Sequence, residues 1–234
     1  MEVKTENIGS TEKAGWLVNN SSEGEAIATI IFAHGAGAPM DSGFMVAMAE
    51  QLALNRIHVI RFEFGYMQQR RLDGKRRPPP KAEKLLGEFR KVVEAVSAMN
   101  SGMPLFIGGK SMGGRIASLL AADTNGVDSG VAGCFCAGYP FHPPGKPGRW
   151  RTDHFNELAM PVRIAQGTRD PFGRYEEVEH HLAERLLGSP SLTVSWLDSG
   201  EHDFRPTKAS GREQADLIAS VAQDAATWMG TLND

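Results

Sequence analysis

The sequence predicts an α/β fold in which a mostly parallel sheet is covered by helices on both faces. Apolar, β-branched runs alternate with helical patterns along almost the whole chain, as they do in βαβ units. The run at residues 26–33, AIATIIFA, is apolar almost throughout, which is typical of a strand buried on both faces. Because the 234 residues contain no internal repeat and no low-complexity linker, a single domain over residues 1–234 is expected.

The expected strands are short apolar runs that end at glycine or at polar turn residues. They lie at residues 15–18, 26–33, 57–64, 104–108, 131–137, 162–166 and 192–197. Helices are expected where apolar residues recur every three or four positions, as Leu85, Phe89 and Val93 do. They lie at residues 44–54 (after an N-cap at Asp41 or Ser42), 78–99, 112–122, 175–187 and 212–229. In such sheets the chemistry gathers at the carboxyl ends of the strands.

The composition argues against several classes of function. The net charge of −3 gives no overall attraction to nucleic acid or to an anionic membrane. No apolar run approaches the about 18 residues of a membrane span, and the polar start MEVKTENIGS lacks the apolar core of a signal peptide, so a cytoplasmic location is expected. Cys134 and Cys136 are interpreted as buried reduced thiols, since no C-x-x-C pair or matching histidine set accompanies them.

The stretch at residues 107–114, IGGKSMGG, fits two different functional motifs. Gly-Lys-Ser ends a phosphate-binding P-loop, whereas Gly-Lys-Ser-Met-Gly is also a G-x-S-x-G nucleophile elbow. A P-loop requires a glycine five positions before Gly109, but Pro104 stands there. An elbow requires an apolar strand, small residues two positions before and after the nucleophile, and a following helix, and all of these surround Ser111. The sequence therefore favours the elbow, in which small neighbours permit a strained backbone.

Four motifs carry a resemblance to a known family: HGAG at 34–37, GKSMG at 109–113, GTRDPFG at 167–173 and SGEHDF at 199–204. With these motifs the chain resembles the α/β-hydrolase superfamily over nearly its whole length, which implies the α/β-hydrolase fold. The stretches GGKSMGGR and RRPPPK are similar to a branch of small, nearly lidless hydrolases, related to the hydrolase-like subunit of a nuclear lysine-acetyltransferase (NSL) complex. The chain also resembles dienelactone-hydrolase-like esterases.

The resemblance implies a Ser-Asp-His triad in that chain order, with Ser111 as the nucleophile. Among the seven histidines, only His202 lies in a loop just past the final strand, where the general base belongs. The orienting acid should follow the preceding strand, and Asp170 does so. Asp198 and Asp203 are close to His202 in the sequence, but neither follows that strand.

Backbone N–H groups that bind the developing oxyanion are expected at two places. One is the N–H of Met112, directly after the nucleophile. The other belongs to the HGAG loop, whose glycines let the backbone approach a substrate, and Ala36 and Gly37 are both candidates. The resemblance implies that Ser111 attacks an acyl carbon and that water releases the acyl-enzyme, without a metal or an organic cofactor.

Related hydrolases often carry a lid where this chain has residues 138–161. The insert is short and rich in proline and glycine, so it predicts a minimal lid, a loop with one helical turn. A shallow site of this kind favours small or exposed acyl groups. Tyr139 and Trp150 are candidates for lining the pocket, although packing within the insert explains them equally well.

Residues 70–84 are strongly basic in a chain of negative net charge. They hold seven basic side chains against two acidic ones, Asp73 and Glu83. One interpretation is a site for an anionic substrate or partner, formed by Arg70 and Arg71 with the help of Lys110. The other interpretation is a solvated loop.

Two functions follow from these observations. One is a serine hydrolase that cleaves small carboxylic esters or thioesters, and the other is a catalytically idle interaction module of the same fold. The complete Ser-Asp-His set favours the hydrolase, because a scaffold has no need of a strained elbow with its base and acid. The expected partner is a small acyl substrate, with no nucleic acid and no membrane.

Overall fold

The computed structural model describes residues 15–100, 102–123, 130–185 and 191–232. Its centre is a seven-stranded sheet with the order β1-β3-β2-β4-β5-β6-β7. The strands are β1 (Leu17–Asn19), β2 (Ala28–Ala33), β3 (Ile57–Phe62), β4 (Leu105–Lys110), β5 (Val131–Ala137), β6 (Val162–Gly167) and β7 (Leu192–Leu197). β1 pairs with β3 in the antiparallel direction, and the other neighbouring pairs are parallel, which confirms the predicted sheet.

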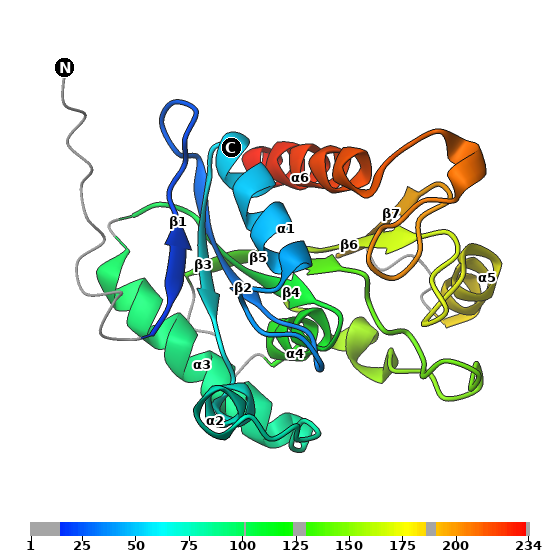
Figure 1. Cartoon of the computed structure of the whole chain (residues 1–234), viewed down its shortest axis with the longest axis horizontal. Coiled ribbons are helices and arrows are strands. Elements are labelled where there is room, and N and C mark those ends of the chain that lie inside the picture. Colours follow the sequence, from blue (N-terminus) through cyan, green and yellow to red (C-terminus); the bar gives the residue numbers. More distant parts are fainter. Residues whose placement is uncertain (1–14, 101, 124–129, 186–190, 233–234) are drawn as a thin grey trace.

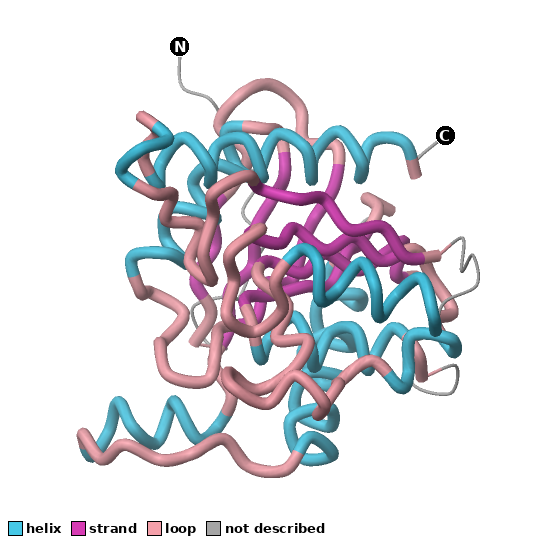
Figure 2. The backbone as a smooth tube through the Cα atoms, turned by 90° about the vertical axis from the view of Figure 1, so that its right-hand side faces the viewer, coloured by secondary structure: helices cyan, strands magenta, loops and turns pink. Residues whose placement is uncertain are grey.

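Helices cover both faces of this sheet (Figure 1). α1 (Gly43–Leu54) and α6 (Gln214–Thr231) lie on one face, and α3 (Ala82–Met99), α4 (Met112–Ala121) and α5 (Tyr175–Arg185) lie on the other. The side view in Figure 2 shows the strands enclosed between these layers. The predicted two-sided arrangement is therefore confirmed.

Strand β2 shows why the sheet needs two helical layers. All six of its residues are buried. Ile31 and Ala33 face the layer of α3 and α4, whereas Ile30 and Phe32 face α1 and α6, since successive side chains of a strand point to opposite faces. Burial of each large apolar side chain contributes about 1.5–3 kcal/mol, so both faces require a cover.

Helix α2 (Gly65–Asp73) was not predicted from the sequence. Its only buried residue is Met67, so it lacks the apolar stripe by which an amphipathic helix is recognised. Gly74 ends it in the left-handed conformation that commonly terminates helices. Ser42 precedes α1 as expected, but its side chain makes no capping hydrogen bond.

Other expectations have mixed outcomes. Cys134 and Cys136 are buried free thiols, as predicted. The polar N-terminal stretch and the end of the helix expected at residues 175–187 lie outside the described residues. Within the described ranges, no helix combines the length and the apolar character needed to cross a bilayer.

The insert at residues 138–161 packs around its own aromatic side chains. Tyr139, Phe141 and Phe155 are fully buried, and their rings contact one another. The 3-10 turn η2 (Asp153–Glu157) is its one helical element. The insert therefore lies against the domain as a loop with a single turn, as the sequence predicts, and forms no helical cap.

His154 of this insert makes the stability of the fold depend on pH. Its Nε2 lies 2.9 Å from Ser118 Oγ of α4, and burial lowers its pKa from 6.5 to about 4. Between these values the unfolded chain binds a proton that the folded chain excludes, so this stability is present above pH 6.5 and is lost as the pH falls toward 4. We expect the wild type to lose about 2 kcal/mol more of its free energy of unfolding over this interval than His154→Gln.

Urea unfolding across this pH range measures the difference. His180→Gln is the matched control, because it also removes an imidazole, from a side chain that is 77% exposed on α5. An equal loss in the wild type and in His154→Gln would contradict the prediction.

Alanine substitutions at Gly113 and Gly87 distinguish a position where no side chain fits from an ordinary helical glycine. A β-carbon on Gly113 would stand 2.4 Å from Ala33 O and 2.7 Å from His34 O, so Gly113→Ala must displace the backbone. We expect this variant to lose about 1–3 kcal/mol of its free energy of unfolding. Gly87 lies within α3 with open space at its β position, and Gly87→Ala is expected to gain about 0.5–1 kcal/mol. Urea unfolding compares the two variants, and equal stabilities would refute the steric requirement.

Candidate active site

Ser111 lies in the turn between β4 and α4 that the sequence predicts. Its φ of 54° and ψ of −115° are strained for a residue other than glycine. Gly109 and Gly113 flank it where no side chain fits, and a β-carbon on Gly109 would stand 2.5 Å from Ala33 O. The turn presents Ser111 to a cavity of about 520 Å³, which is the arrangement of a nucleophile elbow.

Three segments that are far apart in the sequence meet at Ser111. In the loop after β7, His202 Nε2 lies 2.9 Å from Ser111 Oγ. His202 Nδ1 lies 2.8 Å from Oδ2 of Asp170, which is in the loop after β6. Because a carboxylate only accepts hydrogen bonds, Nδ1 carries the proton and Nε2 accepts from the serine hydroxyl. The structure therefore joins the three predicted residues in one hydrogen-bonded chain.

Asp170 is fully buried and is held by two further donors. Gln166 Nε2 lies 3.0 Å from Asp170 Oδ2, and the Phe172 N–H donates to Oδ1 at 2.8 Å. Gln166 also accepts the Tyr139 N–H at 2.7 Å, so it links β6 to the insert. Gln166 was not predicted from the sequence, because a single amide in a strand does not stand out.

The loop after β2, residues 34–40, is held from one side through three successive carbonyl groups. The bonds are Gly35 O to His34 Nδ1 (2.7 Å), Ala36 O to the Tyr66 hydroxyl (2.9 Å) and Gly37 O to the Arg70 guanidinium (2.9 Å). A trans peptide points its N–H away from its carbonyl, and the described chain has no cis peptide bond. The N–H groups of Ala36, Gly37 and Ala38 therefore point away from these supports, and all three residues line the cavity at Ser111.

The three side chains that bind these carbonyls are His34, Tyr66 and Arg70, and each carries the proton that it donates. His34 Nε2 accepts the Phe64 N–H at 3.2 Å, so its proton is on Nδ1, and burial lowers the pKa of His34 and keeps the ring neutral. Burial raises the pKa of Tyr66, so the phenol remains protonated. The sequence predicted the loop but missed His34 and Tyr66 as its supports.

The cavity is bounded by the loop after β2, the start of α1 and the loop that carries His202. Its large apolar lining residues are Phe44, Met45 and Phe172, and its charged ones are Lys110, Asp203 and Arg205. Lys110, a predicted binding residue, thus belongs to the lining although it is only 5% exposed.

The Alpha/beta hydrolase domain family matches residues 26–230 of this sequence. The chain belongs to the α/β-hydrolase family. Its fold is similar to that of an alpha-beta serine hydrolase homologue from Coxiella burnetii, with 18% identity, a TM-score of 0.66 and coverage of 89% of this chain and 90% of that chain. It is also similar to a dienelactone hydrolase from Anabaena variabilis, with 19% identity, a TM-score of 0.67 and coverage of 91% and 89%.

A third similar structure is XC6422 from Xanthomonas campestris, described as an a/b serine hydrolase without lid. The identity is 20%, the TM-score is 0.64, and the match covers 91% of this chain and 88% of that chain. At these identities the likeness is one of fold, and it agrees with the short insert of this hydrolase.

Tyr139 and Trp150 do not line the hydrolase cavity, so the expectation that they wall the pocket is wrong. The Tyr139 ring is fully buried, and its hydroxyl donates to Arg151 O at 2.8 Å. Trp150 stacks on His181 with 3.6 Å between ring centroids, at a separate pocket of about 260 Å³. The two rings pack within the insert and against α5, which is the alternative that the sequence left open.

Arg70 and Arg71 also lie outside the cavity lining, which corrects their expected contact with a substrate. Helix α2 folds back over the loop after β2, where Arg70 binds Gly37 O. Arg71 pairs with the buried Glu63 and with Asp41, both at 2.7 Å, and these hydrogen bonds raise the pKa of Arg71. Both side chains therefore brace the loop.

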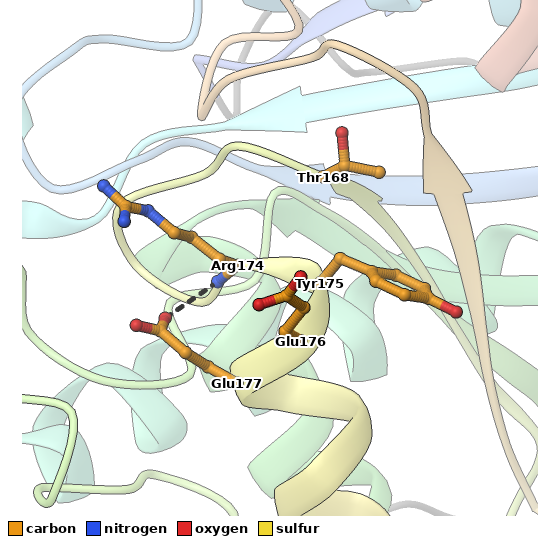
Figure 3. A pocket seen from close by; sticks show the side chains of 5 residues that line it. All are labelled: Thr168, Arg174, Tyr175, Glu176 and Glu177. Atoms are coloured by element: carbon orange, nitrogen blue, oxygen red, sulfur yellow. Dashed lines mark hydrogen bonds between the residues drawn. The ribbon is translucent and has the colours of Figure 1, made fainter.

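A third pocket lies at the start of α5 and holds none of the three triad candidates (Figure 3). It is lined by Thr168, Arg174, Tyr175, Glu176 and Glu177. The Arg174 N–H donates to the Glu177 carboxylate at 3.2 Å, and Figure 3 shows the Arg174 and Tyr175 side chains pointing in opposite directions. The polar groups of this pocket do not converge on one point.

The Tyr66 hydroxyl is expected to order the loop at residues 34–40. Tyr66→Phe removes the hydrogen bond to Ala36 O, which is a net loss of about 1 kcal/mol. We expect amide hydrogen exchange in the loop to rise about fivefold, and modification of Ser111 by a fluorophosphonate to slow about fivefold to tenfold. Tyr175→Phe, at a ring 45% exposed on α5, is the control and should alter neither rate. Unchanged exchange in Tyr66→Phe would rule out this support.

Proposed function

We propose that this α/β hydrolase is a serine hydrolase that cleaves small carboxylic esters or thioesters through an acyl-enzyme. The observation that carries the proposal is the hydrogen-bonded chain from Ser111 Oγ through His202 to the buried Asp170, at the edge of a cavity. A serine hydroxyl needs such a base, and the base needs such an acid, to act as a nucleophile near neutral pH.

In the first half-reaction Ser111 Oγ attacks the acyl carbon while His202 Nε2 takes the hydroxyl proton. Asp170 keeps the ring in this orientation and stabilises the imidazolium. His202 then gives the proton to the departing alcohol or thiol as the C–O or C–S bond breaks. In the second half-reaction His202 deprotonates water, which attacks the acyl carbon. His202 then returns the proton to Ser111 Oγ as the acyl–Oγ bond breaks and the carboxylic acid is released.

The oxyanion is stabilised by the backbone N–H groups of Met112 and Ala36. Met112 begins α4, where first-turn N–H groups have no partner within the helix and the helix dipole favours negative charge. Gly35 lies close to the nucleophile, because a β-carbon added to it would stand 3.8 Å from Ser111 Cβ. The N–H of the next residue, Ala36, is therefore the loop donor nearest to Ser111. The Gly37 N–H, one residue further along, is the alternative donor.

The cavity favours a small acyl substrate that carries an anionic group. Phe44, Met45 and Phe172 offer apolar contacts to a short hydrocarbon portion. Arg205 lines the same cavity and is exposed, which suits a guanidinium that binds a carboxylate. The volume of about 520 Å³ supports a compact substrate.

We also propose that the chain is related to the hydrolase-like subunit of the NSL complex, on the basis of the GGKSMGGR and RRPPPK stretches, and that it is cytoplasmic. The alternative function is a catalytically idle interaction module. Leu72, which is 81% exposed on the basic helix α2, favours that alternative. The assembled Ser111, His202 and Asp170 favour the enzyme.

A fluorophosphonate is expected to modify the wild type and Ser210→Ala at equal rates and to leave Ser111→Ala unmodified. Ser210, in the 3-10 turn η3 (Lys208–Ser210), is the matched serine control. His202→Ala and Asp170→Asn are expected to lower kcat for a short-chain nitrophenyl ester about a thousandfold or more. A folded wild type that neither reacts with the probe nor cleaves an ester or thioester panel would favour the interaction module.

A further inference from the structure

Lys110 lies between the two segments that carry the nucleophile and the base. It is the last residue of β4 and directly precedes Ser111. Its Nζ lies 3.3 Å from Oδ1 of Asp203, which directly follows His202. One ion pair therefore joins the residue before the nucleophile to the residue after the base.

The Lys110 ammonium is buried beside the imidazole. Its Nζ is paired with the Asp203 carboxylate and lies over the Phe44 ring of α1, 5.1 Å from the ring centroid. Gly138 shows how near the ring is, because a β-carbon there would stand 3.0 Å from Lys110 Nζ and 3.5 Å from His202 Nδ1. Burial lowers the pKa of Lys110, and Asp203 and Asp170 oppose that shift.

The charged groups around His202 come from three segments. They are Lys110 of β4, Asp170 of the loop after β6, and Glu201, Asp203 and Arg205 of the loop that carries His202 itself. Helices α1 and α6 face the same cavity with the uncharged Phe44 and Gln214. The His202 ring therefore has the buried Lys110 ammonium and the carboxylates of Asp170 and Asp203 close to it.

We propose that Lys110 and Asp203 are positioning residues that hold His202 against Ser111 and bias its protonation in opposite directions. A nearby ammonium disfavours the imidazolium, whereas the carboxylates of Asp203 and Asp170 favour it. This role rests on the proposed function, in which His202 is the base.

The pH dependence of kcat/KM tests these opposite effects. Lys110→Met has an uncharged side chain of similar length. We expect the acidic limb of the kcat/KM profile to move up by about one pH unit, which lowers kcat/KM about tenfold at pH values below that limb. Asp203→Asn, at a side chain 44% exposed, is expected to move the limb down by about half a unit, because Lys110 remains opposite Asp170.

Two further variants act as controls. Lys110→Arg retains the charge and is expected to keep the wild-type limb. Lys84→Met removes an exposed lysine at the start of α3 and is expected to change nothing. If Lys110→Met fails to fold, the downward shift in Asp203→Asn carries the test, since that side chain is partly exposed.

Opposite shifts distinguish a bias on the base from a structural contact, because loss of a structural ion pair would act alike in both variants. Shifts in the same direction, or an unmoved limb in a folded and active Lys110→Met, would overturn the proposal. NMR titration of the His202 ring follows the same protonation without a substrate. An inactive wild type would defeat the proposed function, while the ring titrations would still decide the roles of Lys110 and Asp203.

Discussion

The active site depends on how closely the end of β2 approaches the glycines on either side of Ser111. A β-carbon on Gly109 or Gly113 would stand within 2.5 Å of Ala33 O, so backbone meets backbone there without side chains between. This contact requires a sharp turn and leaves Ser111 at positive φ. It also brings the loop after β2 beside the first turn of α4, so one packing constraint places the serine and the surrounding N–H groups together. The fully buried strands β2 and β4 supply the stability that offsets the strain.

Around this contact the site is organised mainly by groups that do not touch a substrate. Three carbonyls of the loop after β2 are bound from the side away from the cavity, which fixes the direction of the following N–H groups. N–H groups held in this way need no reorientation when negative charge develops. Gln166 and the Phe172 N–H bind the two carboxylate oxygens of Asp170 and fix its position. Asp170 in turn fixes the orientation of the His202 ring.

How much of this can be predicted from the sequence depends on whether the signal is local. Strands β5 and β7 were predicted with their observed limits, because each is written in a contiguous stretch. The candidates Ser111, His202 and Asp170, which the structure brings into contact, were also recognisable from short local motifs. Helix α2 was missed because its polar residues contact loop carbonyls about 30 positions away. The basic charge of residues 70–84 was counted as free, although Arg71 has its partners in Glu63 and Asp41. Only the fold brings those groups together.

The loop that carries His202 follows β7, which lies at the edge of the sheet and is much less buried than β2. The least protected parts of a fold open first, with free energies well below that of global unfolding. His202, the proposed general base, therefore follows the least buried of the strands that carry the site, while Ser111 follows one of the most buried. Fraying of this edge would separate His202 from Ser111 while the core of the sheet stays intact, so the proposed activity is expected to be lost at a lower temperature than the fold.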